Sequence, residues 1–175
     1  MTTPSTPLRP EPFEQFQRRR SGAYFNPERY HKKMHRFNKR RFLKVPIASF
    51  LNIPCNVEKR IRRAKRTIAK AGASDSEELM LVEMKSSKRS NLYFSFAPHV
   101  DLPKEDTEDF NGIFVSQVFD GGFTDMSRNI SVMERWIADT FGESAKLSKH
   151  EYFAHYPQKP TKDGEQRTVL FARIC

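Results

Sequence analysis

Carboxylates set among aromatic residues are the side chains of this sequence best suited to chemistry. The segment KHEYFAHYP contains Glu151, followed by Tyr152, His155 and Tyr156, while Glu134 borders an apolar helical stripe. An acid among rings can favour a cation or activate a water molecule. One hypothesis is hydrolysis with Glu151 or Glu134 as general base and a tyrosine or histidine as proton donor. The alternatives are an exposed strand-end carboxylate for Glu151 and a surface ion pair for Glu134.

Aromatic rings and one amide supply the candidate binding surface. Rings offer stacking area to a flat ligand. Asn52 lies in an otherwise apolar strand, so its amide needs a hydrogen-bond partner, which is either the backbone or a ligand. Trp136, the only tryptophan, could instead form the edge of the core. The predicted ligand-binding residues are Phe119, Phe123, Trp136, Tyr152, His155, Tyr156, Asn52, Tyr30 and Phe37.

Several common catalytic and cofactor arrangements lack support in the sequence. No G-x-S-x-G segment anchors a serine nucleophile, and Cys55 and Cys175 form no C-x-x-C pair. The pair Gly121-Gly122 lacks the spacing of a phosphate-binding loop. We therefore expect neither a cofactor nor a metal. The two glycines are expected to permit positive φ at a strand-to-helix turn, with a side chain of the following TDMS segment as the helix cap.

Positive charge is concentrated in the first part of the chain. Residues 1–70 hold 19 Lys and Arg against 4 Asp and Glu, a balance of +15, whereas residues 71–175 hold 12 against 17, a balance of −5. Basic residues interleaved with aromatic ones are typical of RNA-binding segments. The alternatives are a weak nucleic-acid contact through residues 18–70, or a basic tail followed by the solvated face of a helix.

The composition indicates a cytoplasmic protein. No segment approaches the roughly 18 consecutive apolar residues of a membrane span, and the N-terminal MTTPSTPLRPEPFEQ lacks the apolar stretch of a secretory signal. We expect no membrane association and reduced cysteines. The oligomeric state is not indicated by any pattern.

The candidate residues must be positioned by two successive sets of elements. Residues 1–24 predict a disordered basic leader, and residues 25–175 a folded domain. A helix is expected around 27–40, because Tyr30, Met34 and Phe37 follow helical spacing. The first set, about residues 42–98, contains a strand at 47–53, a helix from Val57 to Ala71, and strands at 78–84 and 91–97.

The same order of elements begins again after an acidic connection at 100–110. The second set, about residues 112–174, contains a strand at 112–119, a helix from Met126 to Phe141, and strands at 151–156 and 168–174. The predicted fold is α+β: two β-α-β-β units form one antiparallel sheet with the helices on one face. A ligand cleft is expected at the seam between the units.

This order, with VFDGGF entering the second helix, resembles the GyrI-like small-molecule-binding superfamily. Its members commonly read Glu-Gly-Pro-Tyr where this chain reads Asp120-Gly121-Gly122-Phe123. The chain is most similar to a bacterial branch loosely labelled hydrolase, through FNPE, SFLNIP, Met133-Glu134 and TVLFARI, over about residues 25–175. That branch usually has Cys-Pro-x-Cys where this chain has Tyr-Pro-Gln-Lys at 156–159, so the thiols are absent here.

The resemblance implies binding of aromatic or amphipathic compounds and favours Glu151 as the acid. The superfamily includes effector-binding domains of transcription regulators, gyrase-inhibitory proteins and hydrolases that open the cyclopropane ring of DNA-alkylating natural products. The first interpretation is therefore a domain that binds or sequesters small molecules. The alternatives are a hydrolase that detoxifies electrophilic compounds of the cyclopropane type, and a nucleic-acid-associated protein that uses the basic N-terminal half.

Overall fold

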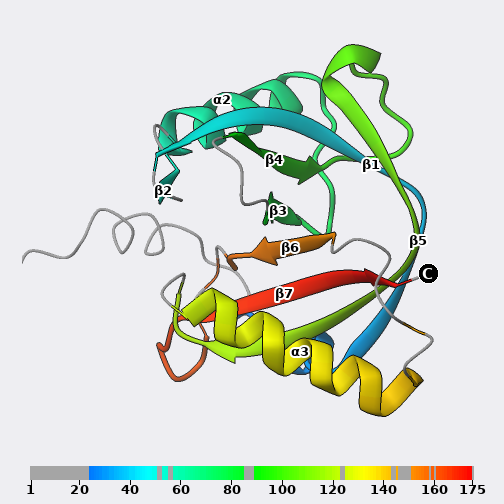
Figure 1. The fold of residues 1–175 in the computed structure, drawn as a ribbon. Coiled ribbons are helices and arrows are strands. Elements are labelled where there is room, and N and C mark those ends of the chain that lie inside the picture. Colours follow the sequence, from blue (N-terminus) through cyan, green and yellow to red (C-terminus); the bar gives the residue numbers. More distant parts are fainter. Residues whose placement is uncertain are drawn as a thin grey trace, which may run out of the picture.

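The sheet of this protein closes on itself. The computed structural model describes residues 24–50, 53–54, 57–84, 89–122, 125–142, 145, 151–157, 159 and 161–174. Six antiparallel strands form a barrel in the order β1-β4-β3-β6-β7-β5, and β5 pairs with β1 to complete the ring (Figure 1). The strands are β1 (Lys33–Phe50), β3 (Met80–Glu83), β4 (Arg89–Ser95), β5 (Thr107–Asp120), β6 (Tyr152–His155) and β7 (Arg167–Ile174), and a short β2 (Ile53–Pro54) pairs with the end of β1.

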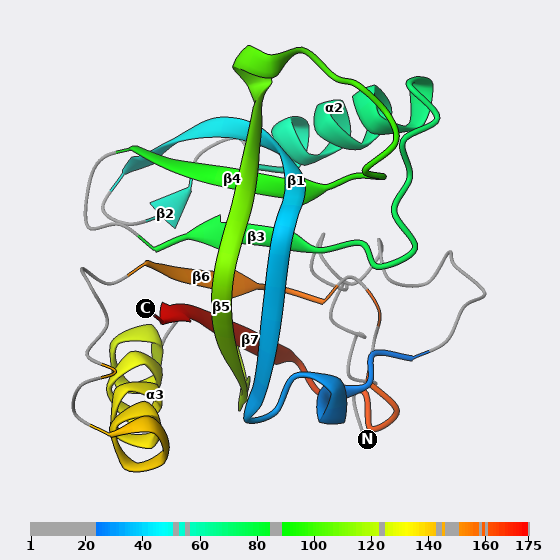
Figure 2. The same ribbon diagram turned by 90° about the vertical axis from the view of Figure 1, so that its right-hand side faces the viewer.

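The two longest strands close the barrel. Residues 33–43 of β1 pair with β5, and residues 42–48 pair with β4. The register shifts between Phe37 and Arg40, where Lys39 has φ 48° and the facing Gly112 has φ 115°. Such a bulge bends and twists a strand. Figure 2 shows the result: β1 and β5 cross in front of β4, β3, β6 and β7.

The prediction of one open sheet with helices on one face and a cleft at its seam is wrong. The order of elements within the two β-α-β-β units is as expected. However, segments 33–46 and 107–111 are also strands, and their pairing closes the sheet. The helices consequently cover different outer faces of the barrel (Figure 1). α2 (Val57–Lys70) packs near β1, β3 and β4, whereas α3 (Met126–Phe141) packs near β5, β6 and β7.

The predicted helix around 27–40 is also wrong. Only a 3-10 turn, η1 (Pro27–Arg29), forms there, with the Asn26 side chain accepting a hydrogen bond from the Glu28 amide at 3.0 Å. From Lys33 the chain is a strand. Met34 is 56% exposed while Phe37 is buried. The pairing with β5 therefore overrides a helical spacing that involved only three residues.

The two longer helices form where apolar spacing predicts them. Ala64 and Ile68 are the buried residues of α2, with Val57 and Ile61 packed beside them, and Gly72 follows the helix with φ 65°. In α3 the buried stripe includes Met126, Met133 and Ile137. None of the helices in the described part of the chain is long and apolar enough to cross a membrane.

The turn into α3 matches part of the expectation for the two glycines, because Gly121 has a positive φ and Gly122 does not. Gly121 has φ 86°, and its carbonyl accepts a hydrogen bond from the Thr168 hydroxyl at 2.7 Å. Asp125 occupies the N-cap position but its side chain makes no capping bond. Thr124 lies outside the described residues.

Aromatic rings fill the inside of the barrel. Alternation along each strand sends one set of side chains inward and the other toward α2 or α3. The inner aromatic cluster consists of Phe25, Phe37, Phe42, Tyr93, Phe110, Phe114, Phe153 and Phe171. Among its members, the ring centroids of Phe42 and Phe110 lie 4.5 Å apart and those of Phe37 and Phe114 lie 4.7 Å apart. These rings are in contact, so the barrel has a packed core.

Candidate ligand-binding site

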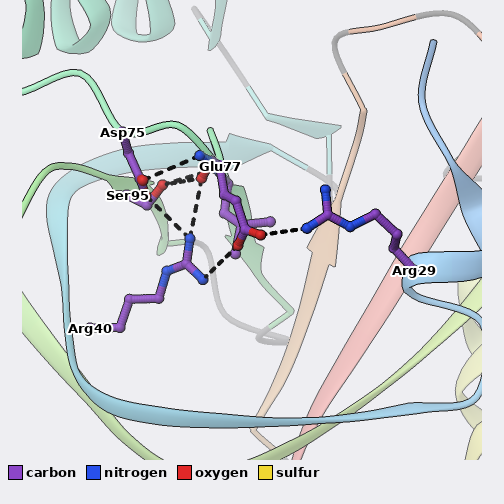
Figure 3. A network of polar contacts seen from close by, with 6 residues as sticks. Arg29, Arg40, Asp75, Glu77 and Ser95 are labelled. Atoms are coloured by element: carbon purple, nitrogen blue, oxygen red, sulfur yellow. Dashed lines mark hydrogen bonds and ion pairs between the residues drawn. The ribbon is translucent and has the colours of Figure 1, made fainter. Parts of the chain in front are cut away.

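One end of the barrel is closed by a network of ion pairs. The Arg40 guanidinium lies between Asp75 and Glu77, with 3.2 Å from Nη2 to Asp75 Oδ2 and 3.5 Å from Nη1 to Glu77 Oε2. Arg29 of η1 reaches the other oxygen of the same Glu77 carboxylate, and the Ser95 hydroxyl donates to the Glu77 carbonyl at 2.9 Å (Figure 3). The network therefore fastens η1 and the loop before β3 to the barrel.

Beneath this network, Tyr30 packs against the inner aromatic cluster. Its ring centroid lies 5.6 Å from Phe25, 6.0 Å from His155 and 6.0 Å from Phe171. Burial lowers the pKa of His155 to about 4, and its Nδ1 lies 3.0 Å from the Met80 carbonyl. A carbonyl can only accept, so Nδ1 carries the proton of a neutral ring. The interior of the barrel below the ion pairs is consequently uncharged and filled by packed rings.

The other end of the barrel carries a ring of polar side chains over the same aromatic cluster. We call it the polar mouth. Its members come from β1, β3, β4, β5 and β7 and from the residue before β6: Lys44, Glu83, Asn91, Tyr93, Glu108, Glu151 and Arg173. The side chains of Lys44, Glu108, Arg173 and Glu151 are between 39% and 48% exposed, so this end is open to solvent.

Three pairs of side chains organise the polar mouth. Lys44 Nζ lies 2.9 Å from Glu108 Oε2, and Asn91 Nδ2 donates to Glu83 Oε2 at 2.7 Å. On the opposite strands, Arg173 Nη1 donates to Glu151 Oε2 at 3.0 Å. The register explains the first two pairs, because Phe42 of β1 pairs with Glu108 of β5, and Val82 of β3 pairs with Leu92 of β4.

The Tyr93 hydroxyl is the buried centre of the polar mouth. It donates a long hydrogen bond of 3.5 Å to Glu108 Oε2. Burial raises the pKa of the Tyr93 phenol well above its usual value, and the negative charges of Glu83 and Glu108 raise this pKa further. The hydroxyl thus remains a donor at physiological pH, with two carboxylates acting on it.

Aromatic rings lie directly below these polar groups. Tyr93 is 4.9 Å from Phe110 and 5.9 Å from Phe153 between ring centroids. The Arg173 guanidinium lies 6.0 Å from the Phe114 ring centroid, a cation–π distance. Because the rings touch one another, an organic ligand must lie above them or displace them.

A small cavity lies elsewhere, between α2 and the loop before β3. It has a volume of about 90 Å³ and is lined by residues that include Ile68, Leu79 and Phe94. Pockets for drug-sized ligands are typically about 300–1,000 Å³. This cavity is therefore too small for an organic ligand of that size.

The predicted binding residues fall into separate regions. Tyr30, Phe37 and His155 meet inside the barrel, where Tyr30 and His155 are in ring contact and Phe37 belongs to the same cluster. Phe123 and Asn52 lie outside the described residues.

A second group of predicted residues lies outside the barrel, beneath α3. Phe119, Trp136 and Tyr152 belong to the cluster that α3 forms with β5, β6 and β7, and Tyr156 borders both this cluster and the one beneath α2. The Tyr152 hydroxyl donates to Glu134 Oε1 at 3.0 Å. Burial raises the pKa of Tyr152, and this hydrogen bond and the negative charge of Glu134 raise it further. Burial also raises the pKa of Tyr156.

The two predicted acids do not share a site. Glu134 is on the outer face with Tyr152, whereas Glu151 directly precedes β6 and pairs with Arg173. Of the predicted residues, only Glu151 belongs to the polar mouth.

Sequence reasoning missed Glu83, Tyr93 and Glu108. Tyr93 lies in NLYFSFA, where alternation separates it from Leu92 and Phe94 but does not reveal which face is inward. Glu108 lies in a segment that reads as an acidic connection, although β5 begins at Thr107. The sequence does contain one signal for this face. Glu108, Phe110 and Phe114 are spaced by even numbers of residues on either side of Gly112, as expected for side chains on one face of a strand.

Comparison with known proteins places the chain in a family. The family model described as "Bacterial hydrolase" matches residues 14–174. The chain belongs to this bacterial hydrolase family. The predicted resemblance to a bacterial branch labelled hydrolase is thereby confirmed.

Several solved structures share the fold of this family member at low identity. The EcmrR C-terminal domain is 13% identical with a TM-score of 0.57, covering 83% of this chain and 98% of that domain. A hydrolase from Listeria innocua is 12% identical with a TM-score of 0.56, covering 83% and 92%. SAV2435 bound to tetraphenylphosphonium is 10% identical with a TM-score of 0.51, covering 83% and 94%. No curated protein matches the chain.

Proposed function

We propose that this protein binds a flat or amphipathic organic cation at the polar mouth of the barrel. The observation that carries the proposal is the placement of the Glu83 and Glu108 carboxylates around the Tyr93 hydroxyl, above Phe110 and Phe153. The acids would face the positive charge of the ligand, and the rings would contact its apolar part.

Electrostatics favour a cation over an anion at this position. A carboxylate near buried rings interacts strongly with a cation, because the local dielectric constant is lower than that of water. Lys44 holds Glu108 in the free protein at 2.9 Å. A ligand cation would take the place of the Lys44 ammonium, which is 39% exposed and can turn toward solvent. The similarity to SAV2435, a protein solved with tetraphenylphosphonium, supports this ligand class.

Calorimetric titration with tetraphenylphosphonium tests the proposal. We expect saturable binding that Glu108→Gln weakens by about tenfold, which corresponds to about 1.4 kcal/mol. Asp109→Asn is the matched control, because Asp109 is the adjacent exposed residue and pairs with Arg41 at 3.8 Å on the other face of β5. Equal affinities for the wild type, Glu108→Gln and Asp109→Asn would exclude the polar mouth as the cation site.

Hydrolysis of electrophilic compounds of the cyclopropane type is the second candidate function. Membership of the bacterial hydrolase family favours a hydrolase. In addition, the Glu134–Tyr152 pair joins a half-buried carboxylate to a phenol that stays protonated. The pair could supply a general base and a proton donor. Product formation that is lost in Glu134→Gln or Glu151→Gln, with folding intact, would support turnover; unchanged product formation in both variants would eliminate these two acids.

A further inference from the structure

We propose that the exposed face of α2 binds the phosphate backbone of double-helical DNA. Six side chains form this surface, which we call the basic face: Lys59, Arg60, Arg62, Arg63, Arg66 and Lys70. All six are exposed. The proposal concerns a surface separate from the polar mouth and goes beyond small-molecule binding.

The charges of the basic face are not neutralised within the described part of the chain. None of the six makes an ion pair with a carboxylate there, and Glu58 is the only acidic residue of α2. Several basic residues of the barrel behave differently, since Arg40 pairs with Asp75, Lys44 with Glu108 and Arg167 with Asp120. The basic face therefore has six cationic groups available to an anionic partner.

Folding does not account for this concentration of charge. Lys59 and Arg63, Arg62 and Arg66, and Arg66 and Lys70 are like-charged pairs four residues apart, and such pairs destabilise a helix. Lys59 and Arg60 also lie near the N-terminus of α2, where the helix dipole disfavours cations. An external polyanion would attract each of these cations and offset the repulsion between them.

The surroundings of α2 favour DNA over a lipid bilayer or a single strand. The apolar residues of α2 are already packed against the barrel, so the helix has no free apolar face to enter a membrane. α2 contains no aromatic residue, whereas single-strand binding relies on base stacking. Four of the six residues are arginines, which bind phosphate in a bidentate manner.

The dimensions of α2 also fit a DNA duplex. Its 14 residues span about 21 Å, and the helix lies along one edge of the molecule, opposite α3 (Figure 1). The B-DNA major groove is about 12 Å wide and admits a helix, while the major groove of A-form RNA is too narrow. The basic face would contact phosphates beside the groove without reading the sequence.

Fluorescence anisotropy with the full chain and a labelled duplex of about 20 base pairs tests the proposal across roughly 50–200 mM salt. We expect binding that weakens with salt. Arg62→Gln/Arg66→Gln should lower the affinity by at least about tenfold at low salt and reduce the logarithmic salt slope by about 1.8, the value for two lost phosphate contacts. The control Arg128→Gln/Arg135→Gln removes the same charge from exposed positions of α3 and should change the affinity by less than about twofold.

Three results would overturn the proposal. Equal losses of affinity for the duplex in the two double variants would mean that net charge alone governs binding. A single-stranded oligonucleotide bound more tightly than the duplex, with the same dependence on Arg62 and Arg66, would assign the face to single strands. Vesicles of anionic lipid that bind the chain through these arginines, while the duplex does not, would assign it to a membrane surface. Circular dichroism of each variant verifies that the fold is retained.

Discussion

The Tyr93 hydroxyl and the Glu108 carboxylate meet at 3.5 Å in the polar mouth. The same oxygen of Glu108 lies 2.9 Å from Lys44 Nζ. One carboxylate thus serves a buried phenol and a half-exposed ammonium at once. If an organic cation binds here, Lys44 is its competitor, and the affinity of the site depends on how tightly Lys44 holds Glu108.

Removal of the Lys44 charge should therefore strengthen cation binding. Lys44→Met keeps an unbranched apolar side chain near the Tyr93 ring but leaves the Glu108 carboxylate without its ammonium partner. Half-exposed ion pairs contribute about 0.2–1 kcal/mol, so the affinity for tetraphenylphosphonium should rise by up to about fivefold. Calorimetric titration measures the change.

Lys104→Met is the matched control for this variant. Lys104 is exposed in η2 (Lys104–Asp106) and belongs to none of the side-chain pairs of the polar mouth. Lys104→Met removes the same charge from the chain as Lys44→Met. The affinity of Lys104→Met for tetraphenylphosphonium should equal that of the wild type. A weaker affinity in Lys44→Met than in Lys104→Met would contradict the role of Lys44 as competitor.

Local patterns in the sequence predicted α2, α3 and much of the strand order, because burial of one face of an element repeats apolar residues at a short interval. Val57, Ile61, Ala64 and Ile68 mark α2 in this way. The helix expected around 27–40 was the exception. The barrel closure was not predictable from such patterns. It depends on pairing between Lys33 and Ser116 or Phe42 and Glu108, residues more than 60 positions apart, and local periodicity carries no information on distant partners.

The site was harder to predict than the fold, because alternation along a strand does not show which set of side chains points into the barrel. Tyr152 and Phe153 are adjacent, yet Phe153 lies in the inner aromatic cluster and Tyr152 lies beneath α3. The sequence drew attention to the KHEYFAHYP segment, of which Glu151 reaches the polar mouth. Glu108 escaped notice because the start of β5 was placed at residue 112 instead of Thr107.

The Arg40 network should stabilise the closed end of the barrel. Arg40→Met removes the contacts to Asp75 and Glu77 and leaves the Asp75 carboxylate, which is 18% exposed, without that partner. We expect the free energy of unfolding to fall by about 1–3 kcal/mol. Urea unfolding followed by the fluorescence of Trp136 measures the loss. Arg36→Met, at an exposed position of the same strand, should cost less than about 0.5 kcal/mol; equal losses would show that the network is not stabilising.

Buried His155 should make the protein less stable in acid. Its folded pKa of about 4 is below the ordinary value of 6.5. Between these two values the unfolded chain binds a proton that the folded chain does not. The free energy of unfolding is therefore unaffected by His155 above about pH 6.5 and falls by up to about 1.4 kcal/mol per pH unit as the pH drops toward 4.

His155→Gln isolates this contribution. Glutamine can still donate to the Met80 carbonyl but does not titrate. Urea unfolding at several pH values should give a shallower decline for His155→Gln than for the wild type between pH 6.5 and about 4, whatever the difference in stability at neutral pH. Parallel curves for the two proteins would refute a depressed His155 pKa. His35, whose pKa burial also lowers, is present in both proteins and cancels from the comparison.

The packed interior makes a direct prediction about Phe114. Its ring is 1% exposed and its centroid lies 4.7 Å from Phe37 and 5.9 Å from Phe110. Phe114→Ala should lower the free energy of unfolding by about 3–5 kcal/mol, because the neighbouring rings cannot fully collapse into the space. Val132→Ala, at a position of α3 that is 39% exposed, should cost less than about 0.5 kcal/mol. If Phe114→Ala costs no more than Val132→Ala in urea unfolding, the rings do not pack as described, and a ligand could enter the barrel without displacing them.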